Sequence, residues 1–140
     1  MDVFEKVDEN AAQFSNTLMR LAAAIDGDIE KVIRLGVLKL FSGIIKRSPV
    51  DTGAYRASHG ITNDEPGERE GIREGGDTFE IGSWSWEIGD GMIYIFNNQP
   101  YAARLEDGWS KQAPAGVYAV ALAEFNQIFQ EELNKIDRLE

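Results

Sequence analysis

The residues with the clearest catalytic potential are Val50-Asp51-Thr52-Gly53-Ala54, which match the signature loop of aspartic proteases. That chemistry needs two such aspartates sharing one proton, so a chain with one copy would have to dimerise. The protease loop follows a β-strand, whereas this segment follows a predicted helix. We therefore interpret it as a turn, in which the Asp51 carboxylate accepts backbone N–H bonds and Gly53 supplies a permissive conformation. The fold-defining residues of this turn are Pro49, Asp51, Thr52 and Gly53.

Other residue types that perform chemistry are few. The chain has no cysteine and one histidine, which excludes a thiolate nucleophile, a disulfide framework, sulfur-based zinc sites and His-rich metal sites. His59 lies on the apolar face of a predicted strand, and no positioned nucleophile accompanies it, so we expect a half-buried, hydrogen-bonded side chain. The acidic groups at 26–30 and 64–70 lack EF-hand spacing, and no glycine-rich phosphate loop occurs. We predict no catalytic residue, no metal and no cofactor.

Two helices are predicted to precede the turn. The first runs from about Asp2 to Ile25, with a heptad seam that consists of Val7, Ala11, Phe14, Leu18, Leu21 and Ile25. This seam packs either on its own domain or on a neighbouring copy. Gly27 is expected to take the left-handed conformation that ends this helix, and Asp28 to cap the next.

The second helix is predicted from Ile29 to Arg47, where Pro49 stops it. Leu35, Leu38 and Ile45 add apolar surface away from its main apolar face, so we expect this helix to be covered on two sides. Gly36 and Gly43 lie seven residues apart on one side, where a neighbouring backbone can approach closely.

The period changes to two from Ala54, which predicts a strand through Ile61. Residues 63–77 have no periodicity, four glycines and a proline, which indicates a mobile loop or hairpin extension. Sheet signals return over 78–88 with a bulge near Gly82-Ser83, and residues 92–96 are apolar on both faces, as in a central strand. A short helix over 101–107, closed by Gly108, and a final helix from near Pro114 to about Leu139 complete the pattern.

The predicted fold class is α+β, with long N-terminal and C-terminal helices packed on a small antiparallel β-sheet. The length of 140 residues suits one domain over 1–140, with a helical part at 1–47, a sheet at 54–98 and a C-terminal helix at 114–139. No run of about 18 apolar residues occurs and the N-terminus lacks a secretory pattern, so we expect no membrane contact and an intracellular location.

The formal net charge of −10 argues against a surface that grips nucleic acid. Nine acids and two arginines lie between Asp64 and Asp90, so the acidity is local. The candidate lumen- or partner-facing acidic residues are Asp64, Glu65, Glu68, Glu70, Glu74 and Asp77.

Aromatic residues concentrate in the sheet half of the chain. Because protein interfaces are enriched in Trp and Tyr, we favour oligomerisation over a purely intramolecular core. The candidate subunit contacts are Phe14, Leu18, Trp84, Trp86, Tyr94, Tyr101 and Trp109.

Two segments resemble the tail-completion and neck proteins of long-tailed bacteriophages. Residues 48–58, Ser-Pro-Val-Asp-Thr-Gly-Ala-Tyr-Arg-Ala-Ser, are similar to the hallmark turn of that family and the strand after it. Residues 101–108, Tyr-Ala-Ala-Arg-Leu-Glu-Asp-Gly, match its tyrosine-to-glutamate-glycine segment, and 109–116 are similar to the lead-in to its C-terminal helix. Asp107 stands where the family often has an aromatic residue. The resemblance spans about residues 28–138.

The resemblance implies a structural virion protein. Copies would form a ring, expected to be a hexamer, at the neck or the head-proximal end of the tail, and the ring would complete the tail for head–tail joining. Its partners would be itself and other neck and tail proteins, such as a tail terminator or tube protein and a head-closure protein. DNA would pass without tight binding, because acidic walls repel phosphate. The protein would reside in the virion, and in the host cytoplasm during assembly.

Two other classes stay open. One is an acidic protein-binding module or DNA-mimic inhibitor, which would need carboxylates arrayed over an extended surface. The other is a dimeric aspartic protease acting through Asp51-Thr52-Gly53. Within the leading hypothesis, residues 64–90 or part of them face the lumen or a neighbouring ring, or the loop becomes ordered on docking.

Overall fold

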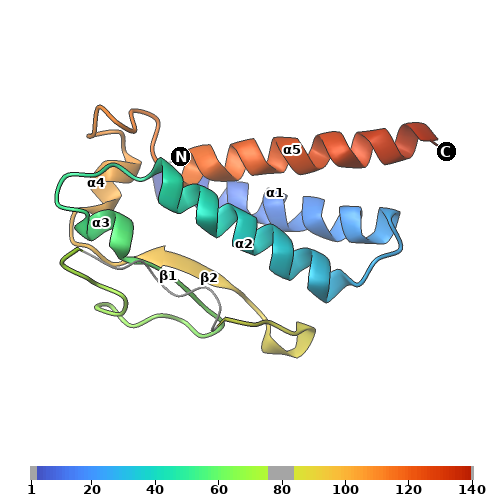
Figure 1. Cartoon of the computed structure of the whole chain (residues 1–140), viewed down its shortest axis with the longest axis horizontal. Helices are drawn as coiled ribbons and strands as arrows, with labels where there is room; N and C mark the ends of the chain where they lie inside the picture. The colour runs from blue at the N-terminus through green and yellow to red at the C-terminus, as the bar shows by residue number, and fades with distance from the viewer. Residues whose placement is uncertain (1–2, 76–83, 140) are drawn as a thin grey trace.

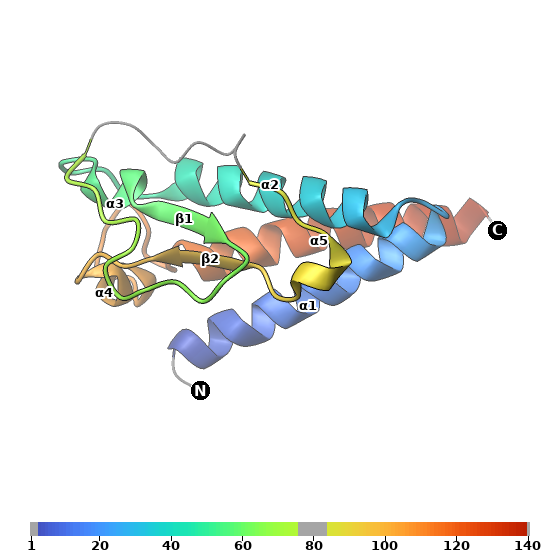
Figure 2. The ribbon, with the colours of Figure 1, turned by 90° about the horizontal axis from the view of Figure 1, so that it is seen from below.

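Three long helices and a small sheet make up the molecule (Figure 1). The computed structural model describes residues 3–75 and 84–139. Helices α1 (Val3–Ala24) and α5 (Tyr118–Leu139) run side by side in the same direction, and α2 (Ile29–Arg47) runs the opposite way. The sheet lies on the side of α1 and α2 opposite α5 (Figures 1 and 2). The α+β class and the long terminal helices are confirmed.

The bounds of the first two helices agree with the prediction. The Asp28 side chain caps α2 by accepting hydrogen bonds from the backbone N–H groups of Glu30 and Lys31, at 3.0 and 3.3 Å. The expected conformation of Gly27 is wrong, because Asp26 takes the left-handed conformation instead, with φ 51°. Asp tolerates that region through local hydrogen bonding, so it can end a helix as a glycine does.

The helical layer holds the main part of the core. Phe14 and Leu18 of the predicted seam are buried, whereas its members Ala11 and Ile25 are exposed. The close approaches expected at two glycines are confirmed: a Cβ at position 36 would lie 2.6 Å from the Leu18 side chain, and one at position 43 would overlap the Phe125 ring. Both α1 and α5 therefore approach α2 on its glycine side.

The strand predicted over 54–61 is wrong in its first half. Residues Ala54–Ala57 form one helical turn, α3, and β1 (His59–Thr62) follows it. The Ser58 hydroxyl donates to the Ala54 carbonyl at 2.6 Å, which stabilises the helical turn. The alternation of Tyr55 and Ala57 fitted a strand because both side chains are buried, but a single helical turn buries them equally well.

The second strand is shorter than predicted and is not central. β2 (Tyr94–Asn97) pairs antiparallel with β1, with Ile61 opposite Ile95, and the described residues contain only this two-stranded sheet. Residues 84–87 are not in a strand, and η2 (Ile88–Asp90) is a 3₁₀ turn that the Glu87 and Asp90 side chains close by capping each other's backbone N–H. The predicted bulge near 82–83 and strand residues 78–83 lie outside the described residues.

The predicted short helix is confirmed as α4 (Ala102–Glu106), and Gly108 follows it with φ 88°. The last helix begins at Tyr118, four residues after the proline expected to start it. Within the described ranges, none of the helices combines the length and hydrophobicity that a bilayer-spanning segment requires.

Candidate functional site

The predicted turn connects α2 to α3 at one end of the molecule (Figure 1). Pro49 holds Ser48 in an extended conformation, with φ −71° and ψ 132°, which ends α2 as expected. The Ser48 hydroxyl donates to the Ile44 carbonyl at 2.8 Å, so the last turn of α2 is closed by a side chain. The turn is thus fixed to the helix that precedes it.

Within the turn, the expected role of Gly53 is confirmed and that of Asp51 is wrong. Gly53 has φ 87°, a left-handed conformation that other residues adopt at a cost. The backbone N–H of Ala54 donates to the Thr52 hydroxyl at 3.2 Å, which is the bond expected of Asp51. The Asp51 carboxylate is exposed and makes no hydrogen bond to any described residue. Threonine forms the local turn, and the aspartate is left facing solvent.

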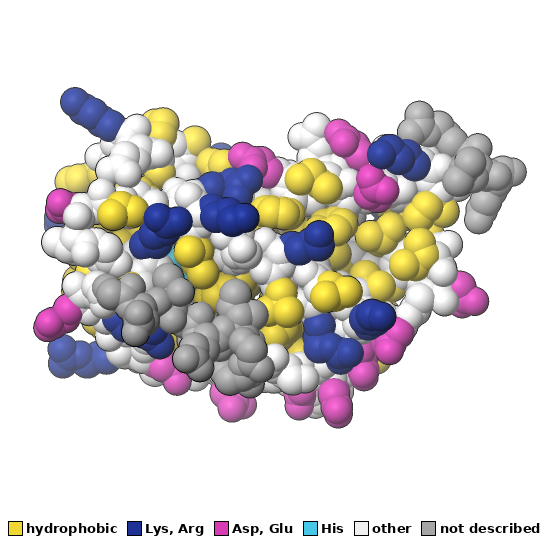
Figure 3. All heavy atoms as spheres, viewed as in Figure 1, with side chains coloured by type: hydrophobic (Ala, Val, Ile, Leu, Met, Phe, Trp, Pro, Cys, Tyr) yellow, Lys and Arg dark blue, Asp and Glu magenta, His cyan; other side chains and the backbone are white. Residues whose placement is uncertain are grey.

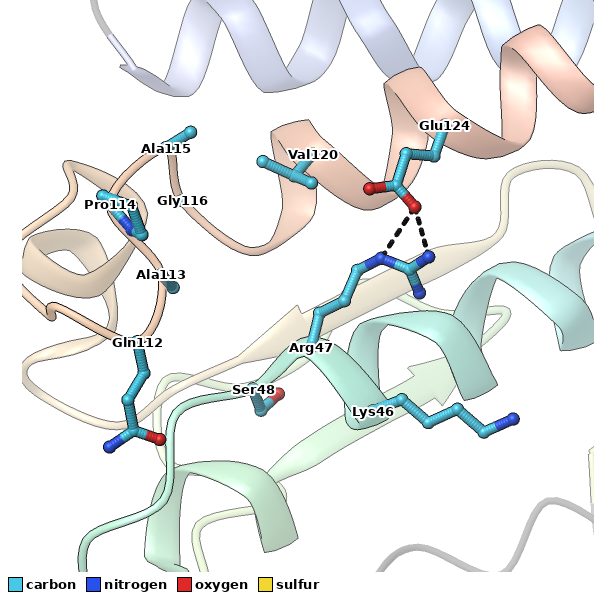
Figure 4. Close-up of a pocket in the computed structure, with 10 residues that line it drawn as sticks. All are labelled: Lys46, Arg47, Ser48, Gln112, Ala113, Pro114, Ala115, Gly116, Val120 and Glu124. Atoms are coloured by element: carbon cyan, nitrogen blue, oxygen red, sulfur yellow. Dashed lines mark hydrogen bonds and ion pairs between the residues drawn. The ribbon is translucent and has the colours of Figure 1, made fainter.

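A residue distant in sequence holds the outer side of the turn. The Gln112 side chain accepts from the Val50 N–H at 3.1 Å and donates to the Val50 carbonyl at 3.2 Å, so one amide satisfies both backbone groups. Beside this pair lies an open groove of about 400 Å³ between the end of α2 and the start of α5 (Figure 4). The Arg47 guanidinium forms an ion pair with Glu124 across it.

The start of α5 is capped by a carboxylate from another helix. Glu106, the last residue of α4, is buried and accepts hydrogen bonds from the backbone N–H groups of Val117, Tyr118 and Ala119 at 3.2, 2.7 and 3.0 Å. These are the donors that the first turn of any helix leaves unpaired, and the negative charge also suits the helix dipole. Sequence reasoning missed this role. Its one local sign is that Val117, which occupies the N-cap position before Tyr118, has no side-chain hydrogen-bond acceptor.

Two of the predicted interface aromatics are exposed near this end. Trp109 is 69% exposed, with the Arg104 guanidinium 5.1 Å from the centre of its ring. Tyr101 is 38% exposed and lies 6.4 Å from the Tyr55 ring in α3. Partial burial raises the pKa of the Tyr101 hydroxyl, and the charge of Asp51 raises it further. We call residues 48–53 and 101–117 together the turn end.

The remaining predicted contacts lie elsewhere, inside the chain. Phe14 and Leu18 belong to the helical core, where the Phe14 ring lies 6.0 Å from that of Phe129. Trp86 is buried, and its indole N–H donates to the Gly91 carbonyl at 2.9 Å. The half-buried Trp84 donates to the Asn63 side chain, and Tyr94 is half-buried in β2. The structure therefore does not bring the seven predicted residues together, and only Tyr101 and Trp109 are exposed.

The predicted acidic segment forms a loop without strands in its described part, residues 63–75, which we call the acidic loop. Asn98 donates to the carbonyls of Gly67 and Glu70 at 2.7 and 3.1 Å. Ser58 and Gln99 bond the backbone of Arg73, which ties the far end of the loop to α3 and β2. The carboxylates of the loop are exposed; they are those of Asp64, Glu65, Glu68, Glu70 and Glu74. Asp77, also predicted for this segment, lies outside the described residues.

His59 is more deeply buried than predicted, with 2% of its surface exposed. Its Nε2 atom lies 2.6 Å from the Ser48 hydroxyl, and its Nδ1 atom lies 2.9 Å from the Tyr118 hydroxyl and 3.3 Å from the Asn97 amide nitrogen. Because Ser48 donates its hydrogen to Ile44, it must accept from Nε2–H. Nδ1 then accepts from Asn97 and Tyr118.

The direction of the hydrogen bond between His59 and Ser48 differs from that in a catalytic serine–histidine pair. A catalytic histidine must accept the hydroxyl proton of a serine nucleophile, whereas here the histidine donates to the serine. Burial lowers the pKa of His59 to about 3, so the ring is neutral near pH 7. The hydrogen bonds of His59 to Ser48 and Tyr118 join β1 to the end of α2 and to α5. A hydrogen-bonded histidine is what the sequence predicted.

No group of acidic or histidine side chains among residues 3–75 and 84–139 is arranged to hold a metal ion. Comparison with protein-family models, with curated proteins and with solved structures finds no match. The chemistry and the surfaces of the chain itself therefore carry the functional argument.

Proposed function

We propose that the protein is a structural component of a tailed phage, forming a ring at the neck or the head-proximal end of the tail. The observation that carries this proposal is the way the two phage-like segments meet. Residues 48–58 and 101–116 lie far apart in the chain, yet Gln112 pairs with the backbone of Val50 and Tyr101 lies beside Tyr55. The two matching segments thus contact each other in the fold.

The bonding at the turn end supports a structural role. Thr52, Gln112 and Glu106 satisfy backbone groups of the turn and of α5, and each does so through contacts within the chain. Asp51 follows helix α2, whereas the loop of an aspartic protease follows a β-strand.

The charge of the acidic loop favours passage of DNA over tight binding of DNA. The acidic loop carries five exposed carboxylates and two arginines, so it repels a phosphate backbone. A ring that carries this charge toward its lumen or toward a neighbour would leave a duplex mobile within it.

The proposed role is tested in particles made without this protein. We expect heads and tails that fail to join, and joining restored when the purified chain is added back. Imaging of the add-back particles should show a ring at the head–tail junction. Particles that join normally without the chain would contradict the proposed function.

The protease alternative has its own test. Asp51→Asn removes the only carboxylate of the Asp-Thr-Gly turn while keeping its size. We expect the variant to assemble like the parent and the parent to cleave no peptide. Peptide cleavage by the parent that Asp51→Asn abolishes would establish the enzyme instead.

A further inference from the structure

One side of α2 consists mainly of exposed residues. We call it the outer face of α2, and it consists of Lys31, Leu35, Leu38, Lys39, Ser42 and Lys46, which span about 100° of the helix at 100° per residue. The Leu35 side chain is 50% exposed. Figure 3 shows Lys and Arg side chains lying among apolar ones across this side of the molecule. The stripe is about 22 Å long at 1.5 Å per residue.

The charge on this face is unbalanced. Helix α2 carries five basic residues and one acid, in a chain whose net charge is −10. Glu30 pairs with Arg34, and Arg47 pairs with Glu124 of α5. Lys31, Lys39 and Lys46 have neither an ion pair nor a side-chain hydrogen bond to any described residue. Within the described part of the chain, three positive charges are thus left over beside the exposed Leu35 and the half-buried Leu38.

The expectation that this helix is covered on two sides holds for two of the three residues on which it was based, because Ile45 packs against the core and Leu38 is half-buried. The glycine side packs against α1 and α5, with Gly36 against Leu18 and Gly43 against Phe125. Leu35 lies on the other side, and half of its surface remains open. Leu35 is therefore the apolar residue of this face whose side chain is left largely exposed.

The acidic loop offers the complementary surface. None of its five carboxylates pairs with a lysine or arginine in the part of the chain that the structure describes. Among them lies Ile72, which is 37% exposed. Asn98 and Gln99 anchor the loop backbone near β2, so its shape is set before any partner arrives. The loop, which carries five acids and two arginines around the exposed Ile72, thus complements a helix face that carries three lysines around Leu35.

We propose that the outer face of α2 in one copy binds the acidic loop of the next copy. The lysines would pair with the loop carboxylates while Ile72 packs against Leu35 and Leu38. Because the two surfaces differ, the contact is heterologous, and repetition of such a contact produces a closed ring or a filament. The inference rests on the proposed ring and names the surfaces that join its subunits.

The apolar residues favour a protein over nucleic acid as the occupant of this face. A phosphate backbone would attract the three lysines but would leave Leu35 and Leu38 without an apolar partner. The acidic loop supplies both kinds of contact. It also belongs to the same chain, so it is present at equal concentration wherever the protein assembles.

Charge reversal in two matched sets tests the proposal. Set A reverses the helix face with Lys31→Glu, Lys39→Glu and Lys46→Glu, and set B reverses the loop with Glu65→Lys, Glu68→Lys and Glu70→Lys. A control set, Asp8→Lys, Glu9→Lys and Glu131→Lys, makes the same charge change as set B at other exposed positions. Self-association of each protein is measured by sedimentation velocity at low and high salt.

We expect the wild type and the control set to associate, and sets A and B alone to associate at least about tenfold more weakly. An equimolar mixture of A and B should regain association, because each supplies the surface that the other has lost. High salt should weaken the wild-type contact. This pattern would support the contact even if the particle experiment contradicted the neck function.

Several results would overturn the proposal. They are a wild type that stays monomeric at its highest soluble concentration, sets A and B that associate like the wild type, and a mixture that does not recover. Retardation of duplex DNA by the wild type, lost in set A without a change in self-association, would assign the face to nucleic acid. Rings that form and join heads regardless of both sets would overturn this contact and leave the neck function standing.

Discussion

The turn end and the outer face of α2 use their polar groups in opposite ways. At the turn end, Thr52, Gln112 and Glu106 bond backbone groups of their own chain. On the outer face, the side chains of Lys31, Lys39 and Lys46 lie near the exposed Leu35 and form no ion pair or hydrogen bond with a described residue. Substitutions at the first region should therefore reduce stability, and those at the second should reduce association while leaving stability nearly unchanged.

The largest effect is expected from protonation of His59, which links the end of α2 to β1 and α5. Its pKa is about 3 in the folded protein and 6.5 in an unfolded chain, so between these values the unfolded chain binds a proton that the folded one excludes. The free energy of unfolding should therefore fall as pH is lowered from 6.5 toward 3, by about 1.4 kcal/mol per pH unit and about 5 kcal/mol in total. Above pH 6.5 this contribution is fully present.

Urea unfolding at a series of pH values checks this dependence. The control is His59→Gln, which cannot titrate, so the difference between the two proteins isolates the histidine from the carboxylates that both share. Equal losses of stability per pH unit in the two proteins would contradict the assigned cause.

Removal of the Glu106 carboxylate should have the next largest effect. Glu106→Ala leaves three backbone N–H groups at the start of α5 without their acceptor, and we expect a loss of about 3 kcal/mol. Glu106→Gln keeps one acceptor oxygen and should lose less. Asp107→Ala, at the exposed neighbouring position, should change the free energy of unfolding by less than about 0.5 kcal/mol. Chemical denaturation compares the three, and equal effects at 106 and 107 would contradict the capping role.

A glycine series should separate backbone strain from steric overlap. At Gly108 the backbone has φ 88° and an added Cβ would overlap the Pro114 carbonyl, so Gly108→Ala should cost about 3 kcal/mol. Gly53 has a similar φ with open space around it, so Gly53→Ala should cost about 1 kcal/mol. Gly89→Ala meets neither obstacle and should be nearly neutral. Thermal unfolding gives the order, and a neutral Gly108→Ala would contradict the turn geometry.

The smallest effect on stability should come from the outer face of α2. The side chains of Lys31, Lys39 and Lys46 form no ion pair or hydrogen bond with a described residue, so each reversal to Glu should change the free energy of unfolding by less than about 0.5 kcal/mol. The same changes are expected to weaken self-association. If they destabilised the monomer strongly, these lysines would belong to the fold and the contrast between the two regions would fail.

Local signals explain which parts of the fold could be predicted. Asp28 and Pro49 mark the ends of α2 in the sequence itself, and the 3.6-residue period fills the helix between them. Alternation could not distinguish the helical turn at Tyr55 and Ala57 from a strand, because two buried residues spaced by two satisfy both. The start of α5 depends on Glu106, eleven residues before the first backbone group it bonds, and no local pattern encodes such a cap.

The candidate site also contains features that local sequence predicts and features that only the structure shows. Gly53 could be predicted because a turn after proline commonly needs a left-handed residue. The two hydrogen bonds between the Val50 backbone and the Gln112 side chain join positions 62 residues apart. No local sequence pattern predicts such a pair, so it is seen only in the structure. Composition could not assign Trp86 to the interior and Trp109 to the surface, because tryptophan serves cores and interfaces alike.

Hydrogen exchange tests the contrast between the two regions most directly. Exchange at residues 64–74 and 48–53 would be measured in the assembled wild type and in set A as the unassembled reference. We predict slower exchange at 64–74 on assembly and no change at 48–53, because the acidic loop gains a partner while the turn is already satisfied. Unchanged rapid exchange at 64–74 in the assembled protein would contradict the account.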